Sequence, residues 1–208
     1  MINKYFPEKT FTALLFDFDG TIADTMSAHF TAWNNALKLY GLKLDIEQHF
    51  GWAGRPTREI LKLLTDATGT EVPVEEFLKS KEEHYFNLIN SVKEIVPVVE
   101  IIKFYHGKMP MAVVSGSRHK PIAATLAQLK LEKYFSVIIA AEDYTHGKPA
   151  PDCFLQAAEA LKVQAQDCLV FEDAQLGIEA AQAAGMACLR VVQGEQAVHK
   201  IQHTQSVK

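Results

Sequence analysis

Hydrophobic and polar positions follow two different patterns along this chain. In the C-terminal half, short apolar runs alternate with stretches in which apolar residues recur every three or four positions. The first pattern is typical of buried strands and the second of amphipathic helices. The expected strands are residues 12–17, Met111–Ser115, Val137–Ala141, Cys168–Phe171 and Ala187–Val192. The expected helices lie near residues 118–129, 151–162 and 176–184.

Residues 26–94 show only helical periodicity. Met26, Trp33 and Leu37, for example, fall on one apolar stripe of a helix. Because strands alternate with helices elsewhere, we expect an α/β protein whose parallel sheet is covered by helices, with an all-helical insert after the first strand. The polar tail from Gln193 is expected to be loosely held.

Composition places the chain among ordinary globular proteins. Of its 208 residues, 48% are hydrophobic and 22% are charged, which suits one domain or one domain with an insert. The net charge of −4 gives no electrostatic footprint for nucleic acid or an anionic membrane. No apolar stretch approaches the roughly 20 residues of a membrane span, and residues 1–10 lack the apolar core of a secretion signal. We therefore expect a cytoplasmic monomer without nucleic-acid or membrane partners, in which Cys153, Cys168 and Cys188 are reduced core residues.

Two carboxylates follow the first expected strand. The apolar run of residues 12–16 leads into Asp17, Phe18, Asp19 and Gly20. In an extended chain alternate residues share a side, which would bring the two aspartates together. Two such charges about 4 Å apart repel by about 4 kcal/mol at an effective dielectric of about 20, so a cation or a proton is expected between them. Acidic residues after a strand are also common in simple turns, and the motif alone leaves that alternative open.

Polar side chains also follow the other expected strands. These are Ser115-Gly116-Ser117, Lys148 in the loop after the third strand, and Glu172-Asp173. Taken singly, each has a structural alternative: a strand-ending serine, a solvated lysine or a helix cap. Ligands of open parallel sheets bind at the carboxyl ends of the strands, so we expect all of these groups at one edge. Four carboxylates, a hydroxyl and a lysine meeting there by chance is improbable.

The expected group of side chains suits phosphoryl transfer. Carboxylates that keep a few positions for water and phosphate oxygens are typical ligands of Mg²⁺. Ser115-Gly116-Ser117 precedes an expected helix, whose N-terminal N–H groups can hold a phosphate, and Lys148 adds a positive charge. A metal, an anion-binding loop and an aspartate nucleophile together predict chemistry through an aspartyl-phosphate.

The chain resembles the haloacid dehalogenase superfamily, in its branch of fructose-1-phosphate phosphatases and beta-phosphoglucomutases. The matching motifs cover almost the whole chain and are Asp17-Phe-Asp19-Gly20-Thr21, Ser115-Gly116-Ser117, Lys148-Pro-Ala-Pro-Asp152 and Phe171-Glu172-Asp173-Ala174 with Gly177-Ile178-Glu179-Ala180-Ala181. This resemblance implies a Rossmann-like core, residues 1–25 plus 95–208, and a helical cap, residues 26–94.

The same resemblance implies a role for each motif residue. Asp17 would be the nucleophile, and Asp19 the general acid that then activates water. Asp17, the Asp19 backbone carbonyl and Asp173 would hold magnesium, with Glu172 acting directly or through a metal-bound water. The transferring phosphoryl group would be bound by Ser115 and Lys148, and the neighbouring Gly116 and Ser117 are expected to contact substrate.

Polar residues in the insert are candidates for substrate contacts. His29 and Lys81 fall on apolar helix stripes, where a charged residue needs a reason. Each could be a satisfied core residue or a snorkelling side chain, or it could face the active site, as the resemblance implies. Thr25 and one arginine of the sequence Gly54-Arg55-Pro56-Thr57-Arg58 are further candidates, and the choice between Arg55 and Arg58 is open. The tryptophans, Trp33 and Trp52, are expected to pack rather than to bind sugar.

The resulting hypothesis is a magnesium-dependent phosphatase acting on a small sugar phosphate such as fructose 1-phosphate or 6-phosphogluconate. The alternative is a phosphomutase of the beta-phosphoglucomutase type, favoured by His29, Lys81 and Arg58. A non-catalytic binding protein on the same fold is the remote third possibility. Sequence alone does not identify the sugar, because one hydrogen bond in the insert can redirect specificity.

Overall fold

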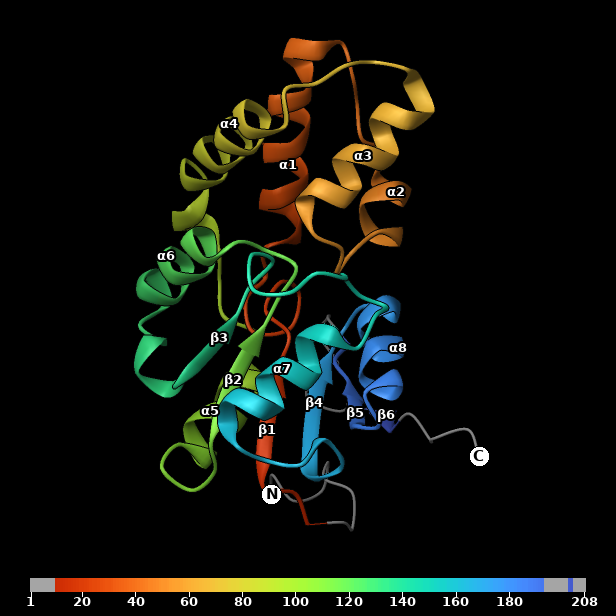
Figure 1. The fold of residues 1–208 in the computed structure, drawn as a ribbon. Helices are drawn as coiled ribbons and strands as arrows, with labels where there is room; N and C mark the ends of the chain where they lie inside the picture. Colours follow the sequence, from red (N-terminus) through yellow and green to blue (C-terminus); the bar gives the residue numbers. More distant parts are fainter. Residues whose placement is uncertain (1–9, 193–201, 204–208) are drawn as a thin grey trace.

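The fold is described by a computed structural model that covers residues 10–192 and 202–203 (Figure 1). Its centre is a six-stranded sheet in the order β3-β2-β1-β4-β5-β6. All neighbouring strands pair in parallel except β5 and β6, which are antiparallel. The strands are β1 (Ala13–Phe16), β2 (Met111–Val114), β3 (Val137–Ile139), β4 (Cys168–Glu172), β5 (Ala187–Arg190) and β6 (Gln202–His203).

Helices cover both faces of the sheet, because alternate strand residues point to opposite sides. Leu14 and Phe16 belong to the core under α5 and α6, whereas Ala13 and Leu15 belong to the core under α7 and α8. These helices are α5 (Val96–Tyr105), α6 (His119–Leu129), α7 (Asp152–Leu161) and α8 (Gln175–Ala183). The two apolar layers fix the register of β1, since a shift by one residue would exchange its faces.

Four helices between β1 and α5 form a separate bundle with its own core. They are α1 (Met26–Leu37), α2 (Ile46–Gly51), α3 (Thr57–Thr68) and α4 (Val74–Phe86). Trp33, Leu61 and Phe77 pack together inside this bundle, which we call the helical insert. Figure 1 shows the insert above the carboxyl ends of the strands. The loops that follow the strands therefore face the insert.

The predicted fold class is confirmed, and each of the five expected strands is present within one or two residues of its predicted ends. The three expected helices of the core are α6, α7 and α8. Helix α5 was not predicted, because its nearly continuous apolar sequence gives no clear helical stripe. All three cysteines are free and buried, as expected.

Most of the tail from Gln193 lies outside the described residues, so its expected looseness is not tested. Within the tail, Gln202–His203 forms β6 against β5. Among residues 10–192 and 202–203, no helix has both the length and the apolar character that crossing a bilayer requires.

Candidate active site

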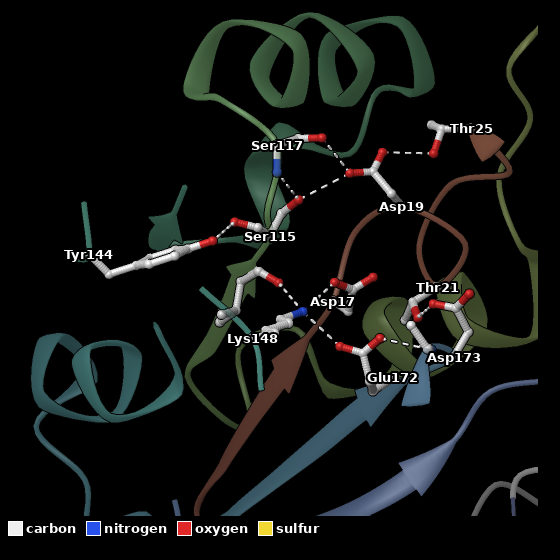
Figure 2. A network of polar contacts seen from close by, with 12 residues as sticks. Asp17, Asp19, Thr21, Thr25, Ser115, Ser117, Tyr144, Lys148, Glu172 and Asp173 are labelled. Carbon is white, nitrogen blue, oxygen red and sulfur yellow. Dashed lines mark hydrogen bonds and ion pairs between the residues drawn. The ribbon is translucent and has the colours of Figure 1, made fainter. Parts of the chain in front are cut away.

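A buried lysine joins two strand ends at the centre of the sheet. Asp17 directly follows β1, Glu172 ends β4, and Lys148 comes from the loop between β3 and α7. The Lys148 ammonium lies 2.6 Å from Asp17 Oδ1 and 2.7 Å from Glu172 Oε2 (Figure 2). A third, longer contact of 3.4 Å goes to the Val114 carbonyl. Lys148 is fully buried, so these ion pairs are held away from bulk water.

The electrostatics of this group follow from burial. Burial raises the pKa of Asp17, and the nearby charge of Glu172 raises it further, while Lys148 opposes both. Burial works against the charge of Lys148, but Asp17 and Glu172 outweigh it and raise the pKa of the lysine well above its usual value. The lysine therefore stays charged and fixes the orientation of Asp17.

Asp17, Glu172 and Asp173 together could hold a metal ion. Each offers one carboxylate oxygen, and these three oxygens lie within 4.8 Å of one another. Burial and the Glu172 charge raise the pKa of Asp173 to about 7, although Thr21 Oγ1 donates a 3.0 Å hydrogen bond to it. A crowded set of carboxylates, in which Asp17 and Asp173 have raised pKa values, fits a hard divalent cation such as Mg²⁺, which prefers oxygen ligands.

The sequence predicts a cation or a proton between Asp17 and Asp19, but the Asp19 carboxylate is not among the three that together could hold a metal ion. Asp17 still continues the strand, because its amide donates to the Phe171 carbonyl of β4, whereas Asp19 leads directly into the turn that begins at Gly20. Asp19 instead accepts hydrogen bonds from hydroxyl groups at 2.6–3.1 Å (Figure 2) and contacts the His29 ring. The hydroxyl donors are Thr25, Ser115 and Ser117.

His29 of the insert reaches Asp19 directly, with its Nε2 2.9 Å from Asp19 Oδ1. Burial alone would raise the pKa of Asp19, but His29 and the hydroxyl donors outweigh it and hold that pKa well below its usual value. Burial lowers the pKa of His29 itself, and the neighbouring Lys81 adds to this effect. The Asp19 carboxylate therefore accepts a hydrogen bond from the N–H at Nε2 of His29. His29 also stacks on Tyr85, with ring centroids 4.3 Å apart.

The loop after β2 lies against the insert. Ser117 N donates to Ser115 Oγ at 2.9 Å, and Tyr144 Oη donates to the Ser115 carbonyl at 3.0 Å. A side chain at Gly116 would place its Cβ 2.6 Å from the carbonyl oxygen of Gly54. Glycine is therefore required at position 116 for this close approach.

A cavity of about 50 Å³ lies between this loop and the insert. Its lining contains Asp17, Asp19, Ser115 and Glu172 from the core. From the insert it contains His29, Trp33, His49, Arg55 and Lys81, among others. Thus His29 and Lys81, which were predicted from their positions on apolar stripes, both line the cavity. Trp33 packs in the core of the insert and also lines the cavity.

Lys81 is buried, and its ammonium lies 3.2 Å from Thr57 Oγ1. Burial lowers its pKa to about 8, although Asp19 attracts the positive charge. The ammonium also lies 5.4 Å from the centre of the Trp33 ring. A substrate group with negative charge or lone pairs would find a poorly solvated cation here.

Arg55 and Arg58 point to different surroundings. Arg55 lines the cavity, and its buried Nε has no hydrogen-bond partner among the described residues. Arg58 is more exposed, pairs with Glu75 and does not line this cavity. Glu59 lies beside Arg55 and accepts a 3.2 Å hydrogen bond from the Gly147 amide of the core loop.

Sequence reasoning missed several polar residues of the site. His49 lines the cavity, Thr57 contacts Lys81, and Tyr144 supports the Ser115 loop. His49 lies in a helix of only six residues, too short to display an apolar stripe against which a histidine would stand out. Tyr144 lies in a loop, where no periodicity exists to mark it.

Known proteins match the chain over most of its length. The family model for haloacid dehalogenase-like hydrolases matches residues 14–191. The chain is 39% identical over 181 residues to the fructose-1-phosphate phosphatase YqaB of Escherichia coli, covering 87% of this chain and 96% of that protein. It is 32% identical over 176 residues to a phosphorylated carbohydrates phosphatase of Thermotoga maritima, covering 84% and 82%.

Solved structures agree with these matches. The crystal structure of beta-phosphoglucomutase (pgmB) from Clostridium difficile superposes with a TM-score of 0.80 at 25% identity, covering 88% of this chain and 86% of that one. The family resemblance predicted from the four motifs is thereby confirmed. The chain belongs to the haloacid dehalogenase-like hydrolase family.

Proposed function

We propose that the protein is a magnesium-dependent phosphatase that hydrolyses a small sugar phosphate, such as fructose 1-phosphate or 6-phosphogluconate, through an aspartyl-phosphate on Asp17. The observation that carries this proposal is the buried Lys148, which holds Asp17 and Glu172, two residues of the cavity lining, close to Asp173. The sugar-phosphate class is supported by the two phosphatases to which the chain is similar.

In the first step, a carboxylate oxygen of Asp17 attacks phosphorus, and the bond from phosphorus to the sugar oxygen breaks. Lys148 keeps Asp17 oriented and neutralises charge on the phosphoryl oxygens, together with the amides of the Ser115 loop. Asp17, Asp173 and the Asp19 carbonyl would hold Mg²⁺, with Glu172 acting directly or through water. When bound, Mg²⁺ supplies further positive charge for the phosphoryl oxygens.

Asp19 would handle the protons of both steps. It follows the nucleophile by two residues, and Thr25, Ser117 and His29 hold its carboxylate. Protonated Asp19 gives its proton to the departing sugar oxygen. The same carboxylate then removes a proton from the water that attacks phosphorus and frees phosphate from Asp17. Because its pKa is low in the free protein, the charge of the bound substrate has to raise it before the first step.

The helical insert would act as the cap over this chemistry, with the domain boundary near residues 25 and 95. His29, Arg55 and Lys81 would contact the sugar from the insert side of the cavity. Because the insert also supplies the contact to Asp19, its closure would assemble the proton-transfer group and exclude water together.

A phosphomutase is the second candidate function. It uses the same Asp17 chemistry but returns the phosphoryl group to a sugar hydroxyl. The structural likeness to beta-phosphoglucomutase and the basic residues His29 and Lys81 in the cavity favour it. Conversion of beta-glucose 1-phosphate into glucose 6-phosphate, dependent on a bisphosphate primer, would distinguish a mutase from a phosphatase.

The test is a panel of sugar phosphates with purified protein. It holds fructose 1-phosphate, 6-phosphogluconate, both glucose phosphates and pyridoxal phosphate, each assayed with magnesium and with EDTA, and Asp17→Asn is the blank. We expect magnesium-dependent phosphate release from one or two sugar phosphates. Absence of release from the whole panel would contradict the proposal.

A further inference from the structure

His49 is a buried histidine of the helical insert. It lies in α2, is only 5% exposed, and lines the cavity together with Arg55 and Lys81. The rings of Phe30 and Phe50 pack around it, with centroids 5.4 and 5.5 Å away. This packing limits rotation of the imidazole, so its two nitrogens have fixed environments.

A backbone contact determines which nitrogen of His49 carries the proton. Nε2 lies 3.0 Å from the carbonyl oxygen of Met26. A carbonyl can only accept a hydrogen bond, so Nε2 must be the protonated nitrogen. Burial lowers the pKa of His49 to about 4, which makes the ring neutral at pH 7. Nδ1 then carries a lone pair and no proton, and it can only accept.

Within the part of the chain that the structure describes, the hydrogen bond of the His49 ring is the one at Nε2, and Nδ1 has no partner. The other polar groups on the insert side of the cavity are mainly donors. Lys81 offers an ammonium group, and Arg55 offers a guanidinium whose buried Nε is also unpartnered among residues 10–192. His49 is therefore an acceptor placed among cations.

We propose that His49 Nδ1 accepts a hydrogen bond from a hydroxyl group of the substrate, and thereby selects phosphate monoesters of polyhydroxylated compounds. This inference rests on the proposed phosphatase function. A hydroxyl group is both donor and acceptor, so it can donate to His49 while it accepts from Lys81 or Arg55. A carboxylate at the same point would meet the Nδ1 lone pair with its own lone pairs and would be disfavoured.

The test combines substrate analogues with variants. Fructose 1-phosphate, or the best substrate of the panel, is compared with analogues in which one hydroxyl at a time is replaced by fluorine, which cannot donate. In the wild-type protein we expect one position whose replacement lowers kcat/KM by about tenfold or more, because a site built to bind a hydroxyl rejects the analogue without it. In His49→Phe that position should lose its effect, while the native sugar phosphate loses activity to a similar extent.

Two controls separate this inference from the proposed function. 4-Nitrophenyl phosphate has no sugar hydroxyl, so its turnover should stay within about threefold of wild type in His49→Phe. His84→Phe changes a histidine of α4 that does not line the cavity, and it should leave both substrates unaffected. If the wild-type protein releases no phosphate from any substrate, the proposed function fails. If it is active but His49→Phe shows the same analogue pattern as wild type, only the role of His49 fails.

A measurement on unchanged His49 covers the case in which His49→Phe does not fold. The variant Asp17→Asn, labelled with ¹⁵N in its histidines, is titrated with fructose 1-phosphate or with the best substrate of the panel. We expect the free protein to show a neutral His49 protonated at Nε2, and binding to shift the Nδ1 resonance in the direction of an accepted hydrogen bond. An unchanged Nδ1 resonance in the saturated complex would overturn the inference.

Discussion

Asp19 and His29 lie 2.9 Å apart, although Asp19 belongs to the sheet edge and His29 to the helical insert. This contact, together with Thr25, Ser115 and Ser117, gives the Asp19 carboxylate its polar surroundings. The environment of the proposed proton-transfer group is thus complete only when the insert lies against the core. In the proposed mechanism, the contact between His29 and Asp19 would therefore couple proton transfer to closure of the insert.

Replacing His29 by Asn should lower kcat for the sugar phosphate by about 10²- to 10³-fold, because general acid–base catalysis contributes about 10² to 10⁴. Loss of the His29 contact should also raise the pKa of Asp19, since burial then acts with less opposition. Because protonated Asp19 is the acid of the first step, the basic limb of the pH profile of kcat/KM should move to higher pH. Ser27→Ala on the exposed side of α1 is the control and should change neither quantity. An unshifted basic limb would refute the role of His29.

Gly116 tests the close approach of the insert to the core. A Cβ at this position would lie 2.6 Å from the Gly54 oxygen and 2.9 Å from the Arg55 oxygen, so Gly116→Ala should hold the insert away from the core. We expect kcat/KM to fall at least tenfold while the melting temperature changes little. Gly51→Ala is the matched control, because its Cβ would meet nothing within 4 Å. Equal activities of the two variants would show that this approach is not needed.

The two arginines of the loop before α3 should differ in their effect on substrate binding. Arg55→Ala removes a cation that lines the cavity and should raise KM about tenfold or more. Arg58→Ala removes only an exposed ion pair with Glu75, so KM should stay within about twofold of wild type. Steady-state kinetics with the best sugar phosphate measure both. The opposite order of effects would mean that the insert binds substrate in another arrangement.

Asp173 should make stability and magnesium binding depend on pH. Its pKa is raised to about 7 in the folded protein against 3.8 for the ordinary group, so the metal-free fold binds this proton more tightly than the unfolded chain does. Its contribution is full below pH 4 and is lost as pH rises through 7. Magnesium requires the ionised form, so its affinity should rise with pH up to about 7 and then level off.

Melting curves in EDTA and in magnesium at pH 5 to 8 test this expectation, with Asp173→Asn as the comparison. The magnesium-induced increase in melting temperature should grow with pH in the wild-type protein. In Asp173→Asn it should be small at every pH. A pH-independent increase in the wild-type protein would show that Asp173 does not titrate in this range or does not bind the metal.

The sequence predicted the sheet and its polar edge because both depend on local patterns. Short apolar runs mark each strand, and the parallel arrangement brings the residues after them to one edge. Lys148 and Glu172 could thus be placed near Asp17 without coordinates. The orientation of Asp19 could not, because it depends on hydroxyl groups far away in sequence, such as Ser117.

The sequence predicted that the insert is helical, but it identified only some of the insert residues that line the cavity. His29 and Lys81 stood out because they interrupt apolar stripes, and both line the cavity. Arg55 lies in the loop before α3 and Arg58 in the first turn of α3, and the sequence does not show that this loop packs on Gly116 and brings Arg55 but not Arg58 into the cavity lining. His49 gave no signal, since its burial comes from tertiary contacts with Phe30 and the Met26 carbonyl.

The central claim is that Asp17, supported by Lys148 and a magnesium ion, takes the phosphoryl group from a sugar phosphate. The most direct test is the rate of phosphate release from the best substrate of the panel by wild-type protein and Asp17→Asn, each in magnesium and in EDTA. We expect rapid release only from the wild-type protein in magnesium, with the other three conditions at background. Release by Asp17→Asn at a rate close to wild type, or release unaffected by EDTA, would contradict the account.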